Sequence, residues 1–160
     1  LWAADCAERV LPYFEKKYSK DKRPRKAIEV GRIWARSKIM KGEGITPNIT
    51  FKEIRAASLA AHAAARRAKE DGNDAACFAA RSAGQAVATA HVPMHAFGVT
   101  YYALKLIEVA SPKNTNVKIT KELGWQERRL PRGLRNKWED WKSLRLPKGL
   151  RPADKSSKKV

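Results

Sequence analysis

Histidine side chains at metal-ligand spacing are the first groups in this sequence that could carry chemistry. His91 and His95 stand four residues apart, and on a helix this spacing points both imidazoles to one side, as a pair of ligands to a divalent metal requires. Pro93 lies between them, and a third ligand would have to come from elsewhere, such as His62 or Asp5. We therefore expect hydrogen-bonded packing residues, with no bound metal and no other cofactor.

The side chains that could act as nucleophiles lack neighbours that would activate them. Cys6 and Cys77 each lie in an alanine-rich run, and neither sits in a nucleophile elbow or beside a cationic helix start. The sequence also lacks a phosphate-binding loop and a dinucleotide-binding glycine pattern. We expect two buried, reduced thiols and a protein that is not an enzyme.

A basic segment with tryptophans near the C-terminus is the most informative feature of the sequence. Residues 111–160 carry 15 basic and 5 acidic side chains, more than half of the formal net charge of +18. Lysine and arginine pair with phosphates, and tryptophan stacks on bases or fills an interface. The candidates for nucleic-acid binding are Arg128, Arg129, Arg132, Arg135, Arg145, Lys148, Arg151, Trp125, Trp138 and Trp141.

The same segment contains an internal repeat. Residues 128–135 read Arg-Arg-Leu-Pro-Arg-Gly-Leu-Arg, and residues 144–151, sixteen positions later, read Leu-Arg-Leu-Pro-Lys-Gly-Leu-Arg. A single repeat of this length is too short to build a solenoid. It would, however, place two similar basic elements along one partner.

Apolar residues at helical spacing predict the elements that must position these groups. One helix is expected over residues 2–18 with a kink at Pro12, and a second from Pro24 to about residue 40. The side chains that we expect to face inward from the second helix are Ile28, Ile33 and Trp34.

Helix signals in the middle of the chain predict three more helices. Thr50 followed by Glu53 is a capping box, which predicts a helix over residues 51–69. A fourth helix follows Asp74, and a fifth runs over about residues 93–110. Because no segment alternates convincingly at period two, the sequence predicts an all-α protein, a compact bundle of about five or six helices.

Composition divides the chain into three parts. Residues 1–110 contain many alanine pairs and triplets, and such small side chains let helices approach closely in a bundle. Residues 111–152 form the basic, tryptophan-containing extension, which we expect to be partly helical. Residues 153–160 are expected to be a disordered tail.

Five motifs, in order over about the first 135 residues, resemble the immunity-protein-five-like family of immunity proteins. The resemblance implies a small helical protein of bacteria or archaea that neutralises a cognate toxin by binding it. It also implies one of two roles for the matching positions Asp5, Cys6, His62, His91 and His95, either a shared polar site or part of the core. The motifs are Leu-Trp-Ala-Ala-Asp-Cys-Ala-Glu-Arg-Val-Leu from residue 1, Ala-Ala-His-Ala-Ala-Ala-Arg from residue 60, Ala-His-Val-Pro-Met-His-Ala from residue 90, Tyr-Tyr-Ala-Leu-Lys from residue 101, and Trp125-Gln126 followed by Leu130-Pro131.

Positive charge sets this chain apart from that family pattern. Immunity proteins for nucleases are often acidic, whereas a net charge of +18 suits an acidic protein surface or a nucleic acid. The sequence therefore predicts a non-enzymatic binding protein that neutralises an acidic protein such as a cognate toxin. The alternative is an RNA- or DNA-binding protein, or a ribonucleoprotein component, that uses the C-terminal extension.

Two further expectations concern location and completeness. No stretch approaches the roughly 20 apolar residues of a membrane span, and the start lacks a signal-peptide pattern. We therefore expect a cytoplasmic protein without membrane insertion. The sequence begins at Leu1, already inside a predicted helix and without an initiator Met, so we expect further residues before it.

Overall fold

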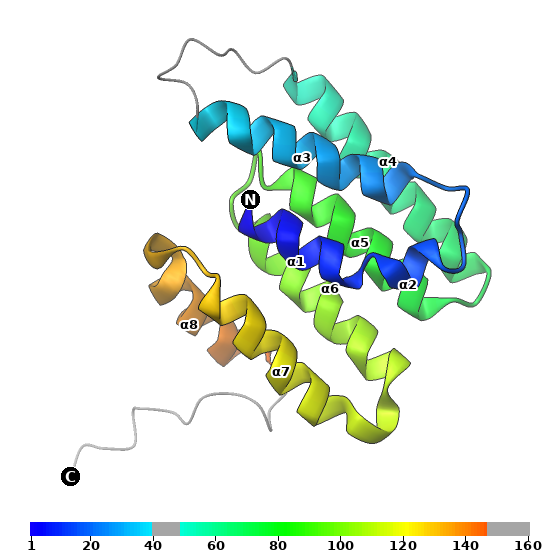
Figure 1. Ribbon diagram of the computed structural model, residues 1–160, viewed down its shortest axis with the longest axis vertical. Helices are drawn as coiled ribbons and strands as arrows, with labels where there is room; N and C mark the ends of the chain where they lie inside the picture. The colour runs from blue at the N-terminus through cyan, green and yellow to red at the C-terminus, as the bar shows by residue number, and fades with distance from the viewer. Residues whose placement is uncertain (40–48, 147–160) are drawn as a thin grey trace.

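Helices form all of the regular secondary structure in the residues that the computed structural model describes, 1–39 and 49–146. The all-α prediction is therefore confirmed for these residues. The short 3-10 helices η2 (Pro112–Asn114) and η3 (Arg132–Leu134) precede the last two α-helices. The α-helices are α1 (Trp2–Val10), α2 (Pro12–Glu15), α3 (Arg23–Ile39), α4 (Phe51–Glu70), α5 (Asp74–Ala88), α6 (His95–Ala110), α7 (Thr115–Arg128) and α8 (Arg135–Arg145), as Figure 1 shows.

The expected number of five or six helices is too low. Within the described residues there are seven α-helices of nine residues or more, besides the four-residue α2. The difference comes from the basic extension, in which α7 and α8 are both regular helices of more than ten residues. Their low content of apolar residues weakens the periodic signal on which the prediction relied.

The first predicted helix is divided at its proline. Pro12 has no N–H to donate to the carbonyl of Glu8, and the N–H of Leu11 instead bonds to both Ala7 O (3.1 Å) and Glu8 O (3.2 Å). Helix α1 consequently ends at Val10, and α2 begins at Pro12. The expected kink is thus present, as a break between two helices.

Helix α3 packs on α4 and α5, and two of the three residues expected to point inward from it are covered. Ile28 is buried in the main core. Trp34 is half-buried against a smaller apolar cluster that includes Ile54 and Val87, but Ile33 is 50% exposed. Gly31 lies on the packed face, where an added Cβ would be 3.3 Å from the Cα of Val87. Ile33 lies five residues after Ile28 and so points away from this face.

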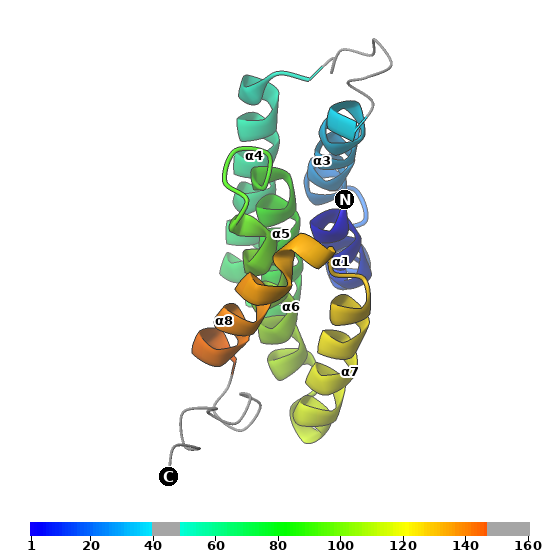
Figure 2. The same cartoon turned by 90° about the vertical axis from the view of Figure 1, so that its left-hand side faces the viewer.

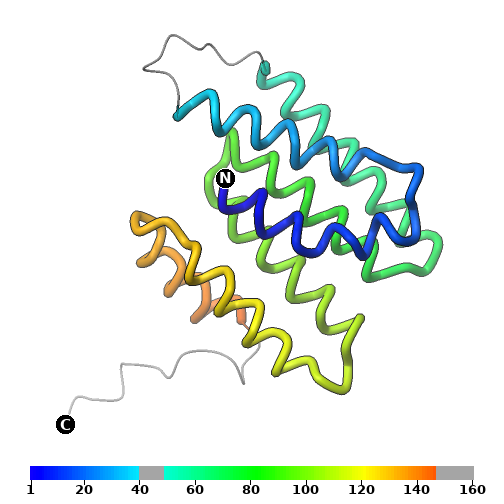
Figure 3. Tube along the Cα trace, viewed as in Figure 1, coloured from blue at the N-terminus to red at the C-terminus, as the bar shows by residue number. Residues whose placement is uncertain are grey.

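Helix α5 is the centre of the bundle. It contacts α1, α2, α3, α4 and α6. Ten of its fifteen residues are buried, and eight of these ten are alanine, glycine or serine. Side chains of this size let neighbouring helices approach from several sides. The Cα trace shows α1 lying along α5 and α6, although those helices are far downstream in the chain (Figure 3).

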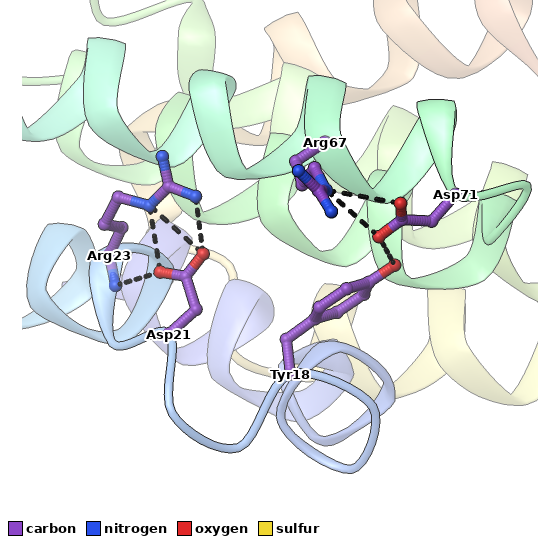
Figure 4. Close-up of polar contacts among 5 residues, drawn as sticks. All are labelled: Tyr18, Asp21, Arg23, Arg67 and Asp71. Atoms are coloured by element: carbon purple, nitrogen blue, oxygen red, sulfur yellow. Dashed lines mark hydrogen bonds and ion pairs between the residues drawn. The ribbon is translucent and has the colours of Figure 1, made fainter.

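Polar contacts fix the ends of α3 and α4. The capping box is confirmed, since Glu53 N–H donates to Thr50 Oγ1 (3.3 Å) and Thr50 N–H donates to Glu53 Oε2 (2.7 Å). In the turn before α3, Tyr18 Oη donates to Asp71 Oδ2 (3.0 Å), which ties this turn to the end of α4 (Figure 4). In the same turn Asp21 accepts from the backbone and guanidinium of Arg23, which lowers the pKa of its carboxyl.

Helices α7 and α8 flank α6 on the side of the bundle away from α3 and α4 (Figures 1 and 2). Helix α6 ends at Ala110, where the composition changes, but Ile119, Leu123 and Trp138 are buried in the same core cluster as α1, α5 and α6. The described part of the basic extension is thus packed into the bundle. No helix among the described residues is long and apolar enough to cross a membrane.

Candidate functional site

The five residues of the polar site implied by the family resemblance differ in their environments, although His91 contacts His95 and the charge of His95 also acts on His62. Asp5, on the outer side of α1, accepts from Arg32 Nη2 (2.7 Å), which also donates to Glu8 (2.7 Å). Cys6 is fully buried in the core, and burial, with the nearby Glu122 and Asp5 carboxylates, raises the pKa of its thiol. These two positions therefore supply a surface ion pair and a protonated core thiol.

His62 packs against α5. Its ring lies so close to Gly84 that an added Cβ would be 2.8 Å from Cε1, and its Nδ1 is buried without a hydrogen-bond partner in the described structure. Burial, together with the positive charges of Arg81 and Arg66, lowers the pKa of His62. The imidazole is consequently kept neutral and serves as a packing element between α4 and α5.

His91 and His95 contact each other, but not through helical spacing. Helix α6 begins at His95, so His91 lies in the preceding turn, and the two rings meet edge to face with centroids 5.5 Å apart. Burial and the neighbouring His91 lower the pKa of His95. Over residues 1–39 and 49–146, no three histidine, cysteine, aspartate or glutamate side chains are arranged to hold a metal ion.

Trp125 is half-buried and covered by two arginines. The guanidinium of Arg9 lies 4.0 Å from its ring centroid and that of Arg129 lies 4.2 Å from it. Arg9 also donates from Nε and Nη2 to Glu122 at 3.1 and 2.9 Å, which holds its side chain in place. Trp125 therefore links α7 to α1 by cation–π contacts.

A buried polar network, which the sequence alone did not reveal, joins α1, α6 and α7. Gln126 Nε2 donates to Glu122 Oε1 (3.0 Å), and Thr100 Oγ1 donates to Gln126 Oε1 (2.6 Å). Trp2 Nε1 donates to the backbone carbonyl of Gln126 (2.9 Å). Trp125-Gln126 is part of a family motif, but their contacts with Arg9 and Trp2 join residues more than 100 positions apart. No local sequence pattern predicts such contacts.

Trp138 is fully buried, so in this position it cannot stack on a base. Its Nε1 donates to Glu127 Oε1 (3.1 Å), and its ring packs edge to face on Trp2, with centroids 5.8 Å apart. Trp141 stacks on Trp138 at 5.3 Å and is only half-buried. Of the three expected stacking residues, Trp141 alone has a ring that borders an open groove and is not covered by arginines.

Four of the six arginines predicted to bind nucleic acid lie together between the end of α7 and the start of α8. Among the ion pairs found in the described residues, none uses one of these arginines. Lys148 and Arg151 lie outside the described residues. We call the exposed junction of α7 and α8 the basic corner, made of Arg128, Arg129, Arg132 and Arg135; the exposed Arg145 lies at the far end of α8.

A groove of about 640 Å³ runs between α6 and α8, beside Trp141. No sequence pattern predicts this groove, because it exists only where two helices distant in the chain face each other. We call it the α6–α8 groove. Its apolar walls are Met94, Phe97, Tyr101, Tyr102, Trp141 and Leu144, and its polar residues are Gln85, Lys137, Asp140 and Arg145, with Gly98 completing the lining.

Comparison with known proteins identifies a family. No curated protein and no solved structure matches the chain significantly. A family model, described as Imm-5 like putative immunity protein, matches residues 1–133, which include α1 to α7 and the buried network of Glu122 and Gln126 but not α8. The resemblance read from the sequence motifs is thus confirmed, and the chain belongs to the Imm-5 like putative immunity protein family.

Proposed function

We propose that this protein is a non-enzymatic immunity protein that binds a protein toxin and neutralises it as a stoichiometric complex. The observation that carries the proposal is family membership over residues 1–133, most of the chain. The environments of the candidate nucleophiles agree with it, because Cys6 is buried with a raised thiol pKa and Cys77 is also buried. Inhibition by binding needs a complementary surface and no catalytic group.

The charge of the protein supports an acidic partner surface. The basic corner exposes four arginines within eight residues, none of them in an ion pair with the described residues. Unpaired arginines are well suited to bidentate contacts with carboxylates, and a net charge of +18 accelerates the approach of an acidic protein. We therefore place the toxin's acidic surface against this corner.

Nucleic acid is the less supported partner. Arginines bind phosphates as readily as carboxylates, but base stacking needs accessible aromatic rings. Trp138 is fully buried, and Trp125 is covered by Arg9 and Arg129. Two of the three tryptophans expected to stack are therefore engaged within the bundle.

The test is co-expression with each candidate toxin encoded by the genes that flank this one. We expect restored growth of the host and a complex of fixed stoichiometry on size exclusion with light scattering. Reversing two charges of the basic corner, by Arg132→Glu together with Arg135→Glu, is expected to weaken the complex at least about tenfold. The matched control, Lys17→Glu with Lys20→Glu, changes the net charge equally at exposed positions between α2 and α3 and should have a smaller effect.

Two results would contradict the proposal. One is the absence of both growth rescue and a complex. The other is submicromolar binding of mixed-sequence RNA at physiological salt, with a steep dependence on salt concentration that the Arg132→Glu and Arg135→Glu changes reduce. That second result would move the protein to the nucleic-acid-binding class.

A further inference from the structure

We infer that the α6–α8 groove is the anchor site for the partner protein, and that it takes an acidic segment carrying one large aromatic or aliphatic side chain. The inference rests on the proposed function and specifies the kind of segment that the partner presents. It follows from the lining of the groove, its rigidity, its polar rim and its place relative to the family's matched residues.

The lining of the groove is suited to an apolar anchor. Among its lining residues Phe97 is buried and Trp141 is half-buried, whereas Met94 is 51% exposed and Tyr101 is 39% exposed. A volume of about 640 Å³ is in the range of ligand-binding clefts. Exposed apolar surface gathered in a concavity marks an interaction site, and aromatic and methionine side chains are enriched at protein interfaces.

The groove is held open by contacts beneath it. Trp141 stacks on the buried Trp138 and lies 6.0 Å, centroid to centroid, from Phe97. Lys142 pins α8 to α7 by donating to Glu127 at 2.7 Å. Because these side chains are already ordered, the protein loses little conformational entropy when a ligand side chain enters the groove.

The polar rim selects a peptide with carboxylates. Lys137 and Arg145 lie on α8 and form no ion pair among the described residues, so they are available to carboxylates that flank the anchor. Asp140 and Gln85 provide acceptors and a donor for the backbone of a peptide. Asp140 would repel a phosphate chain, which also has no apolar side chain to fill the groove.

Charge argues against a second copy of this chain as the occupant. Two molecules of net charge +18 repel each other, and a symmetric contact here would bring Lys137 and Arg145 toward their own copies. An acidic partner is instead attracted by the net charge and by Lys137 and Arg145. The protein partner required by the proposed function is therefore also the occupant that the groove's charge favours.

Only one of the two walls of the groove lies within the residues that the family model matches. Helix α6 lies inside the matched residues 1–133, whereas Lys137, Trp141 and Arg145 of α8 lie beyond them. The groove thus adds a wall outside the family match to a wall within it. Such a wall can determine which partner this particular chain accepts.

The first experiment titrates ¹⁵N-labelled full-length protein with synthetic peptides. The probe is an eight-residue peptide with one central phenylalanine and glutamates on both sides. We expect a shift of the Trp141 indole resonance and a smaller or no shift for Trp125. A peptide with serine in place of phenylalanine, one with lysines in place of the glutamates, and a uridine oligonucleotide should leave the Trp141 indole largely unchanged.

The second experiment tests the groove with substitutions that should not unfold the protein. Lys137→Glu with Arg145→Glu, or Tyr101→Ser alone, is expected to weaken peptide binding about tenfold. Each changes a surface side chain, and an unchanged far-UV circular dichroism spectrum without peptide verifies the fold. Lys17→Glu with Lys20→Glu is the control of equal charge change, and it should bind the peptide more tightly than the groove variant.

The outcomes separate this inference from the proposed function. If the acidic peptide does not shift Trp141, or if the oligonucleotide shifts it more strongly, the groove is not a site for an acidic protein segment. If the groove variants form the toxin complex as tightly as wild type, the anchor site is overturned while the proposed function stands. If the peptide binds in the groove but no toxin complex forms, the proposed function fails and the site remains.

Discussion

Replacing Trp138 with alanine is the sharpest test of how the basic extension is integrated into the fold. The indole of Trp138 is fully buried between Trp2, Phe97 and Trp141, with ring centroids 5.3 to 5.8 Å away. It is also the largest side chain that α8 places in the main core. Trp138→Ala should therefore leave a cavity where α8 meets α1 and α6.

The expected loss of stability can be worked out from these contacts. Tryptophan-to-alanine changes in a core destabilise by about 3–5 kcal/mol. The hydrogen bond to Glu127 adds about 0.5–1 kcal/mol at most, since Glu127 is partly exposed and keeps its contact with Lys142. Because α8 can shift toward the gap, we expect about 4 kcal/mol, a large part of the roughly 5–15 kcal/mol typical of a domain.

The assay is urea unfolding followed by far-UV circular dichroism. Trp138→Phe keeps an aromatic ring in the cluster but loses the N–H donor, so we expect a smaller loss of about 1–2 kcal/mol. Val117→Ala, a 58% exposed position on α7, is the control and should change stability by less than about 0.5 kcal/mol.

A small effect of Trp138→Ala would refute this reasoning. If the loss is under about 1 kcal/mol, the indole does not occupy a packed core site. The tryptophan would then be free for an external partner, as the sequence alone suggested. An unfolding curve with two separate transitions would likewise mean that α8 is not part of the cooperative unit.

Three further predictions concern the polar and close-packed contacts. Arg9→Ala and Glu122→Ala should each destabilise the protein. A double-mutant cycle should give a coupling energy of about 1–2 kcal/mol, which is limited because the Arg9 side chain is 38% exposed. Additive effects of the two substitutions would contradict the network. Gly84→Ala should cost about 1–3 kcal/mol, because its Cβ would lie 2.8 Å from the His62 ring, and His62→Ala should relieve it; a loss that persists in the double variant would place the strain elsewhere. Because the pKa of His62 is lowered in the folded protein, the unfolded chain binds the proton more readily. The stability that the neutral imidazole contributes is therefore full above about pH 6.5 and is lost as the pH falls. The difference in Tm between about pH 7.5 and about pH 5 should be smaller for His62→Ala than for wild type.

Helix positions were predicted best where the chain itself signals them. The capping box of Thr50 and Glu53 gave the start of α4, and Pro12 gave the break after α1. Ile33 was assigned to the wrong face, because α3 buries a stripe chosen by contacts with α4 and α5 rather than by apolarity alone. Local residues determine where a helix begins, but its neighbours determine which side is covered.

The candidate site was harder to predict than the fold. The exposed arginines of the basic corner follow directly from composition, because charged side chains remain in water. The roles of Trp125 and Trp138 did not follow, since Arg9 covers one ring and Trp2 contacts the other. These partners are more than 100 positions away, and no pattern within a single helix specifies them.

The sequence by itself determined an all-helical protein of high positive charge, the main helix boundaries and membership in an immunity-protein family. Capping residues, prolines and helical periodicity act within a few residues, so they can be read directly along the chain. Only the tertiary structure decided that α7 and α8 fold back on α1 and α6, burying Glu122 and Trp138 and opening the α6–α8 groove. Those features arise from packing between segments distant in sequence, where the burial of side chains from several helices at once selects the arrangement.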